Sequence, residues 1–467
     1  MNLGACRKVA TPITGTILAR ILTMSNPFAV PLRRVLPGAV FLVGFAIAAC
    51  LRFSGATLTA ALPQTTTAQP LVQQGDMAYV GAFRVPAKAA GDVDVDSFAY
   101  GGTVLTYNPV NDSLYLVGFS QAAKVGELSI PAALVAPAVT DLRRATYLQP
   151  LTDILAGRRT TVDGGVANGV YLGGILPFAN SLIVSAYTYY DGGGTQSLSH
   201  FKTGTNFASV GPVVGPVEVS TALRSPGAGF VAGYMTDVPA AWQSALGCQA
   251  LTGQGAIAVV SRSSYGPSIS CFNPSDIGTV NPAPSTPLVG YPNTHTTLGN
   301  YGPNGNTAFF NGNMKLAGAI FPAGTSSVLF FGRRGQQFCY GPGTTDPSLH
   351  LQPVPGQAPN VYCYDPTNPN KGTHGYPYED FVAAYDVHDL IAVKNGQKKP
   401  WEIVPYATWT FNLPFEQPSK ELIGVTYDPA TRRIFVSAGH QDGNYPIIHV
   451  FTLNAGVAAA GNHLCYW

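Results

Sequence analysis

A short strand pattern recurs along this chain and limits its possible folds more than any other feature. Its last copy, residues 421–453, reads ELIGVTYDPATRRIFVSAGHQDGNYPIIHVFTL. The copy predicts three strands, at 423–427, 433–436 and 448–451, joined by a turn and a polar loop. Alternation of apolar and polar residues between clusters of Gly, Asn, Asp and Pro favours strands over helices.

The first strand of the pattern is a small-residue step followed by apolar residues and a turn. It occurs five times, at 101–109, 173–177, 232–235, 317–322 and 423–427. Second strands are predicted at 114–117, 182–186, 256–260, 328–331 and 434–436, and third strands at 125–130, 199–201, 269–272, 382–385 and 448–451. Weaker fourth strands are predicted at 216–220, 287–291 and 401–410. A missing side chain lets five first strands crowd around one axis, so the sequence predicts an all-β, five-bladed β-propeller.

The fifth repeat has no obvious fourth strand, since residues 454–461 are rich in Gly and Ala. One strand-like segment stands unassigned before the first repeat. Pairing its residues Tyr79–Val85 with Ile448–Phe451 would close the ring and leave no exposed edge. Two insertions interrupt the repeats: 240–246 is predicted to form a helical turn, and 332–380 a long functional or disordered loop.

The first 54 residues are predicted to be a targeting segment. Arg33 and Arg34 precede an apolar run, 35–51, that is too short for a comfortable membrane span and has the length of a secretory signal. The arginine pair faintly resembles a twin-arginine signal, but a plain basic region fits it better. Met24 is an alternative start of the chain.

Residues 47–50 resemble a lipoprotein signal box, in which Cys50 would carry the lipid. The alternative is ordinary cleavage near residues 60–61. We therefore expect an exported protein, periplasmic, cell-surface or extracellular, with a signal at 1–54, a flexible tether at 55–75 and a β-propeller domain at 76–467. Membrane contact is expected only through lipid on Cys50, and the domain is expected to be a monomer.

Five cysteines follow the targeting segment, and export permits disulfides. The pairs Cys248–Cys271 and Cys339–Cys363 would each staple an insertion, leaving Cys465 unpaired. Metal binding by these cysteines is the alternative, although neither CxxC nor HExxH spacing is present. Only 11% of the residues are charged and the net charge is +2, so the chain lacks the positive charge that proteins use to bind nucleic acids.

The hairpin IGVTYDPATRRIFVS resembles the inner hairpin of secreted propellers of the NHL or YVTN repeat kind. The segments LTGQGAIAVVSRSSYG and AYDVHDLIAVKNGQKKPWEIVPY are similar to a group of uncharacterised exported bacterial propeller proteins. That second resemblance implies no function. Five-bladed propellers also include sugar-processing enzymes such as arabinanases and fructosidases, which is an analogy of fold alone.

Charged and aromatic residues gather in loops that the repeat plan delivers to one face. Because the rest of the chain is poor in charge, we interpret this face as a binding site; the alternative is ordinary loop polarity. Candidate catalytic residues are Tyr190, His440 and Glu421, and candidate ligand-binding residues are Arg262, Tyr265, Arg333, Arg334, Asp191 and His374. We expect Arg262, Arg334, Tyr190 and His440 to point into one shared cavity near the axis.

This set of residues suits a glycan or a similar polar ligand. Arginine binds carboxylate or sulfate through two parallel hydrogen bonds, and His or Tyr can transfer the proton in a lyase-type elimination. Paired carboxylates drawn from Glu421, Asp191 and Glu379 would instead give hydrolysis. The prediction is glycan binding with cleavage left open, and the alternative is a non-catalytic interaction protein at the cell surface.

Three aspartates, Asp92, Asp94 and Asp96, alternate with valines. In an extended segment their carboxylates would lie on one side at roughly 7 Å intervals. Such a group of oxygens suits Ca²⁺, the cofactor that the sequence suggests, although the Gly and Glu of an EF-hand loop are missing. The alternative is a solvated acidic loop.

Overall fold

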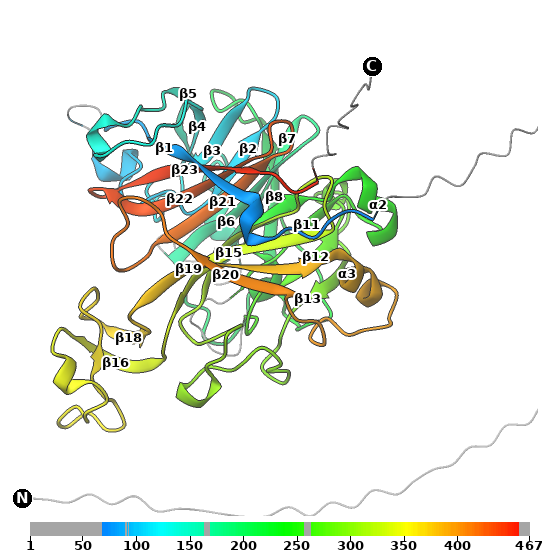
Figure 1. The fold of residues 1–467 in the computed structure, drawn as a ribbon. Coiled ribbons are helices and arrows are strands. Elements are labelled where there is room, and N and C mark those ends of the chain that lie inside the picture. Colours follow the sequence, from blue (N-terminus) through cyan, green and yellow to red (C-terminus); the bar gives the residue numbers. More distant parts are fainter. Residues whose placement is uncertain (1–67, 89–90, 92, 163–168, 256–262, 457–467) are drawn as a thin grey trace, which may run out of the picture. The chain divides into compact units, whose positions relative to one another are not determined.

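Four-stranded antiparallel sheets form the framework of the protein (Figure 1). The structure is a computed structural model that describes residues 68–88, 91, 93–162, 169–255 and 263–456. Over these residues five such sheets follow one another along the chain. The first three are β2 (Leu105–Asn108), β3 (Ser113–Val117), β4 (Val125–Ser129) and β5 (Tyr147–Thr152); β6 (Val170–Phe178), β7 (Ser181–Thr188), β8 (Leu198–Gly204) and β9 (Val214–Glu218); and β10 (Met235–Asp237), β11 (Ala250–Thr252), β12 (Ile269–Phe272) and β13 (Ser285–Val289).

The fourth and fifth sheets each bring together strands that are distant in sequence. The fourth pairs its third strand with a second strand that ends over forty residues earlier, and the fifth takes its last strand from the start of the described chain. Their strands are β14 (Lys315–Ile320), β15 (Ser327–Gly335), β19 (Tyr378–Asp386) and β20 (Ala407–Phe411); and β21 (Leu422–Asp428), β22 (Arg433–Asp442), β23 (Tyr445–Leu453) and β1 (Met77–Arg84).

The first strands of the five sheets lie beside one another in chain order. Strand β2 contacts β6, β6 contacts β10, β10 contacts β14 and β14 contacts β21, which also contacts β2. Glycines permit this approach, as the small-residue steps predicted. A Cβ on Gly173 would lie 2.0 Å from the carbonyl oxygen of Ala232, and one on Gly318 would lie 2.7 Å from Cγ1 of Val425.

Strand β1 pairs antiparallel with β23, so the pairing expected for Tyr79–Val85 is present over Tyr79–Arg84. Phe83 lies opposite Ile448, and both side chains are fully buried. A register shift at Gly81, whose φ is +142°, lets the strand bend between its two halves. Burial of such apolar pairs stabilises β1 as the last strand of this sheet.

The tether expected at 55–75 is wrong at its C-terminal end. Val72 is fully buried, its amide donates to Oγ of Ser327 at 2.9 Å, and its carbonyl accepts from the Tyr406 hydroxyl at 2.7 Å. The composition of the segment did not predict that the apolar Val72 side chain would be buried. Residues 1–67, with the signal and Cys50, lie outside the described chain, and no helix within the described residues is long and apolar enough to cross a membrane.

Three short α-helices accompany the sheets in the described chain. They are α1 (Ala228–Val231), α2 (Ala240–Leu246), which was predicted, and α3 (Val387–Lys394), which was not. Helix α3 begins where the Asp386 carboxylate accepts a hydrogen bond from the backbone of His388. It packs against β13, which belongs to the preceding sheet.

The second strand of the third sheet was predicted at 256–260, but β11 occupies that place at Ala250–Thr252. The predicted disulfide Cys248–Cys271 is present and holds β11 beside β12. Residues 256–260 lie outside the described chain, as does Cys465.

The insertion in the fourth sheet is shorter and more ordered than the predicted loop 332–380. Strand β15 continues to Gly335 and β19 begins at Tyr378, which leaves 336–377 as the insertion. It carries a small sheet in the order β17-β16-β18 and projects away from the other sheets in Figure 1, where it is yellow. The predicted disulfide Cys339–Cys363 staples it, and its strands are β16 (Cys339–Thr344), β17 (Cys363–Tyr364) and β18 (Lys371–His374).

Candidate functional site

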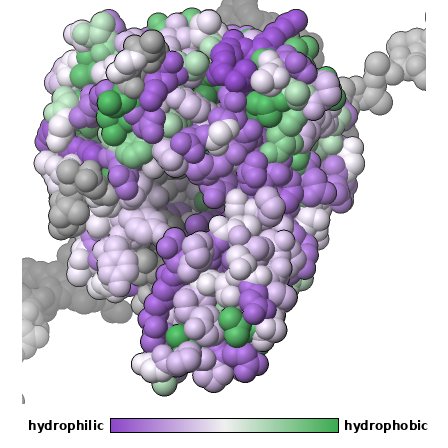
Figure 2. All heavy atoms as spheres, turned by 90° about the vertical axis from the view of Figure 1, so that its left-hand side faces the viewer, coloured by the Kyte–Doolittle hydropathy of each residue, from purple (hydrophilic) through white to green (hydrophobic). Residues whose placement is uncertain are grey.

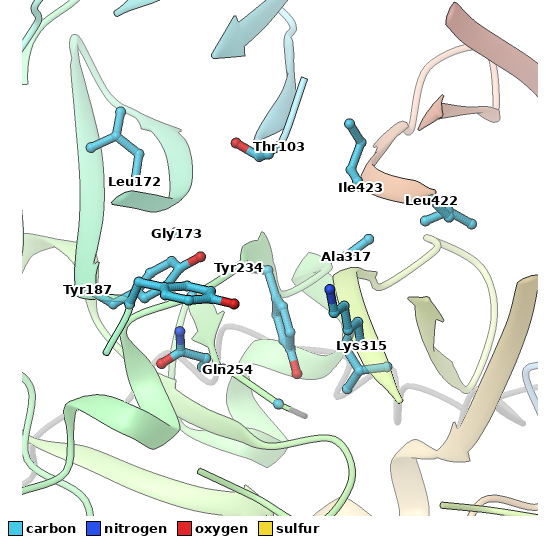
Figure 3. A pocket seen from close by; sticks show the side chains of 14 residues that line it. Thr103, Leu172, Gly173, Tyr187, Tyr234, Gln254, Lys315, Ala317, Leu422 and Ile423 are labelled. Carbon is cyan, nitrogen blue, oxygen red and sulfur yellow. The ribbon is translucent and has the colours of Figure 1, made fainter. Parts of the chain in front are cut away.

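A pocket of about 240 Å³ lies where the first strands begin (Figure 3). All five sheets contribute to it, either from a first strand or from the residues just before one. We call it the lysine pocket. It is lined by Thr103, Leu172, Gly173, Tyr187, Tyr189, Gly233, Tyr234, Gln254, Gly255, Lys315, Leu316, Ala317, Leu422 and Ile423.

The lysine pocket opens on the end of the molecule that also carries the insertion. Lys315 begins β14 and pairs with Arg333 near the end of β15, a few residues before the insertion leaves the sheet. Figure 2 views this end, and the surface there is hollowed near its centre and bordered largely by hydrophilic residues. A ligand would therefore approach the first strands from this side.

Lys315 supplies the positive charge of the pocket. Its ammonium points into the opening in Figure 3, and within the described chain it forms no salt bridge or hydrogen bond. Repulsion from Arg333 lowers the pKa of Lys315 to about 8, and burial adds to the shift, while Glu421 opposes it. The side chain is enclosed by protein yet open to the solvent of the pocket. An ammonium in this position is ready to pair with an anion.

Gln254 brings an unused amide to the same pocket. Only 3% of the residue is exposed, and neither Oε1 nor Nε2 has a hydrogen-bond partner among the described residues. Its backbone N–H donates to Oγ of Ser268 at 2.9 Å, which fixes the segment that carries it. Leaving a buried polar group unpaired costs about 1–3 kcal/mol, so a ligand that hydrogen-bonds to this amide would gain a favourable contact.

Tyrosines form one wall of the pocket. Tyr187 and Tyr189 stand at the end of β7, where the ring of Tyr171 lies 6.0 Å from that of Tyr187 and 5.6 Å from that of Tyr189. The Tyr234 hydroxyl donates to the carbonyl of Ser268 at 2.9 Å, which fixes the orientation of its ring. Burial raises the pKa of Tyr234, so this hydroxyl stays protonated.

Further charges lie beside the lysine pocket, between the fourth and fifth sheets. Arg333 donates to the carbonyl of Ser419, and its guanidinium lies 4.3 Å from the centre of the Tyr378 ring. Asp380 pairs with Arg333 across the strands and is fully buried, and neither of its carboxylate oxygens has a hydrogen-bond partner within the described chain. Burial raises the pKa of Asp380 to about 7, against the attraction of Lys420 and Arg333.

Of the predicted catalytic residues, the structure brings two together. Nε2 of His440 lies 3.5 Å from Oε2 of Glu421, and the His440 ring lies 5.5 Å from that of Tyr100. Neither His440 nor Glu421 lines the lysine pocket, although Glu421 is close enough to act on the charge of Lys315. The third, Tyr190, is 78% exposed and also lies outside the pocket lining.

The predicted arginines do not converge on the central pocket. Arg334 pairs with Glu379, with Nε 3.2 Å from Oε2, and lines a different hollow beside Asn306 and Gln336. Arg333 and Arg334 lie within β15 and His440 lies within β22, because both strands extend beyond their predicted ends. The structure therefore does not bring Arg334, Tyr190 and His440 into one cavity. Arg262 lies outside the described residues.

Three other predicted ligand-binding residues make structural contacts. The buried Tyr265 ring packs at 4.5 Å on Tyr301 and at 5.8 Å on Phe310. His374 is buried in the insertion, with Nδ1 2.9 Å from Oδ2 of Asp365. Asp191 closes a turn by accepting hydrogen bonds from the backbone of Thr195 and Gln196.

The extended acidic segment proposed for Ca²⁺ is not observed. Asp94 and Asp96 lie in a 3₁₀ turn, and their carboxylates pair with Lys88 at 3.1 Å and Lys124 at 2.5 Å. These lysines supply the positive charge that the prediction had assigned to a cation. Asp92 lies outside the described residues, which hold no group of three or more His, Cys, Asp or Glu side chains suited to a metal ion.

Sequence reasoning missed Lys315 and Gln254, yet the repeats hold a signal for the lysine. Lys315 stands three residues before the step glycine Gly318, and Glu421 stands three residues before the step glycine Gly424. Both glycines follow the same register shift between first and second strands. Aligning the repeats on this glycine would have placed Lys315 beside the predicted Glu421.

No family model and no curated protein matches the chain, so the resemblance to NHL or YVTN repeats stays a prediction. Solved structures similar to it include a glycoside hydrolase of the GH130 family that targets β-1,2 mannosidic linkages in Candida mannan (TM-score 0.39, 9% identity, covering 82% of this chain and 96% of that chain). An α-L-arabinanase of Cellvibrio cellulosa is similar with a TM-score of 0.36 and 10% identity, covering 74% of this chain and 89% of that chain. A luciferin-regenerating enzyme is similar with a TM-score of 0.32 and 7% identity, covering 80% of this chain and 94% of that chain. At such scores these likenesses carry no conclusion about what this chain does.

Proposed function

We propose that the chain is an exported five-bladed β-propeller whose lysine pocket binds an anionic glycan. Five four-stranded sheets among the described residues, the mutual contacts of their first strands and the pairing of β1 with β23 support the architecture. Two disulfides fit an oxidising compartment outside the cytosol.

One observation carries the functional proposal: an ammonium without a partner and an amide without partners, both among described residues, line one pocket with tyrosine rings. The Lys315 ammonium would pair with a carboxylate or sulfate. The Gln254 amide would exchange hydrogen bonds with hydroxyl groups. The apolar faces of the tyrosines would cover the C–H faces of a sugar ring. Together these groups match an acidic sugar better than a neutral or apolar molecule.

Binding of uronic-acid oligosaccharides, compared with the same oligosaccharides as methyl esters, tests the proposal. The ester keeps the sugar rings and removes the charge. Lys315→Met should weaken binding of the acid by about 10–100-fold, since a charge-assisted hydrogen bond contributes about 1.5–3 kcal/mol. Calorimetry would measure this loss.

Lys398→Met is the matched control, because Lys398 pairs with Asp389 and does not line the pocket. It removes the same charge from the chain without touching the proposed contact. Equal affinity for acid and ester, or unchanged binding by the Lys315 variant, would rule the proposal out.

A second candidate function is cleavage of that glycan by elimination. Lys315 has a pKa of about 8, so part of it is unprotonated at neutral pH and could take the proton α to the sugar carboxylate. A C=C bond would form as the glycosidic C–O bond breaks, and the resulting ammonium would return the proton to the departing oxygen. Hydrolysis by paired carboxylates has less support, because the residues that line the lysine pocket include no carboxylate in the described chain. Glu421 lies next to that lining rather than in it.

Product analysis separates the three possibilities. An unsaturated sugar end that absorbs in the ultraviolet indicates elimination, and a saturated reducing end indicates hydrolysis. Binding without any product indicates the non-catalytic interaction protein. Lys315→Met should abolish the unsaturated product, whereas Lys398→Met should keep it.

A further inference from the structure

A second pocket, of about 170 Å³, lies at the opposite ends of the same first strands. It shares no lining residue with the lysine pocket. Its lining is mostly apolar and comes from all five sheets. The apolar and aromatic members are Tyr107, Pro109, Ile175, Leu176, Pro177, Met235, Pro239, Ala319, Ile320, Phe321, Ala323, Val425, Tyr427 and Pro429.

One charged side chain, Asp237, stands in this apolar lining, and we call the cavity the aspartate pocket. Asp237 ends β10, where its backbone pairs with Ala250 of β11. Within the part of the chain that the structure describes, its carboxylate has no hydrogen bond and no salt bridge. The surrounding protein raises the pKa of Asp237 to about 6, although the side chain remains open to the pocket.

Several other polar groups of the aspartate pocket already have partners in the protein. The Thr106 hydroxyl donates to the carbonyl of Ile175 at 2.8 Å, and the Tyr107 hydroxyl donates to Asp112 at 3.0 Å. Oγ1 of Thr426 accepts the backbone N–H of Tyr107 at 2.9 Å. No Lys, Arg or His of the described chain lines the pocket, so the Asp237 carboxylate meets no counter-charge among the lining residues.

We propose that the aspartate pocket binds a small molecule that carries a protonated amine on an apolar body. The ammonium would pair with Asp237, and the body would cover the prolines, Ile320 and Phe321. A neutral ligand would displace water from the Asp237 carboxylate without supplying a positive charge in its place, and an anion would be repelled. A divalent cation fits poorly, because Ca²⁺ takes six to eight oxygen ligands and most of this lining is apolar.

Calorimetry on the full chain with cyclohexylamine tests the proposal, with cyclohexanol as the neutral probe of matched shape. Cyclohexylamine should bind saturably and cyclohexanol should not. Asp237→Asn should weaken amine binding by at least about tenfold, the lower end for loss of one charge-assisted hydrogen bond. Asp141→Asn is the control, since Asp141 is exposed in another part of the protein and does not line the pocket.

The pH dependence of the unmodified protein gives a second measurement that needs no variant. Amine affinity should fall as the pH drops through about 6, because Asp237 becomes protonated. Lys315→Met should leave amine binding unchanged, so failure here and failure of the glycan proposal can be told apart. Equal binding of cyclohexanol, full binding by Asp237→Asn, or affinity that is flat between pH 5 and 7 would each overturn the proposal.

Discussion

The pockets at the two ends of the first strands differ in the sign of their charge and in the groups that surround it. The lysine pocket places an ammonium among tyrosines and an amide, next to Arg333 and Glu421. The aspartate pocket places a carboxylate among prolines and aliphatic side chains. A neighbouring charge is the main cause of the lowered pKa of Lys315, whereas burial alone raises that of Asp237. One repeated backbone therefore presents two unlike pockets, because different residues stand at the two ends of its first strands.

The largest expected effect is on glycan binding at high pH. The ligand needs protonated Lys315, so affinity should fall as the pH rises through about 8, by about tenfold for each further unit until it reaches the loss expected for Lys315→Met. Lys315→Arg should hold its affinity to higher pH, because arginine stays protonated there. Calorimetry at three pH values would measure both. An affinity that stays constant from pH 7 to 10 would break the contrast between the pockets.

A smaller effect concerns the stability of the charged cluster beside the lysine pocket. Asp380 has a folded-state pKa of about 7, above its ordinary value of 3.8, so the native state binds more protons than the unfolded state between these values. Stability should therefore fall as the pH rises from about 4 to 7. Asp380→Asn should remove part of that fall, by about 1–3 kcal/mol at pH 8, the cost of an unpaired buried group.

Urea unfolding of Asp380→Asn and of the unmodified protein at pH 5 and pH 8 checks this stability prediction. The two proteins should differ most at pH 8 and least at pH 5. Asp141→Asn, which alters an exposed aspartate, should match the unmodified protein at both values. If Asp380→Asn is instead less stable than the unmodified protein at pH 8, the prediction is wrong, and Arg333 and Lys420 fully compensate the buried Asp380 carboxylate.

The smallest expected effect comes from the tyrosine wall. Tyr189→Ala should weaken glycan binding by about 0.5–1.5 kcal/mol, the size of one aromatic contact. Amine binding in the aspartate pocket should not change, because Tyr189 lines the lysine pocket alone. Parallel titrations with both ligands measure the difference. A loss in both would indicate that the two pockets are coupled through the first strands.

The sequence correctly predicted most of the features that depend on residues close together in the chain. Alternation and turn residues located most of the hairpins, and the helical turn at 240–246 matches α2. The third strand of the third sheet, Ile269–Phe272, has its predicted bounds. The structure contains both predicted disulfides, Cys248–Cys271 and Cys339–Cys363, although spacing alone excluded neither other pairings nor metal binding.

Sequence was insufficient where a side chain's role depends on distant residues. Tyr265 looked like a ligand-binding residue, but Phe310 and Tyr301, more than thirty residues later, enclose its ring. Asp380 lies opposite Arg333 because β19 pairs with β15, although the insertion 336–377 separates the two strands in the sequence. Polarity in a loop therefore did not show which way a side chain points.

Local patterning was enough to predict most of the repeated hairpins, and the need to protect sheet edges was enough to predict the pairing of the first strand with the last. Which residues line the two pockets depends instead on how the five sheets pack against one another. Lys315, Gln254 and Asp237 are ordinary residues in their own segments. They become a candidate site when five strand ends surround them, exclude part of their water and leave their polar atoms without partners in the described chain.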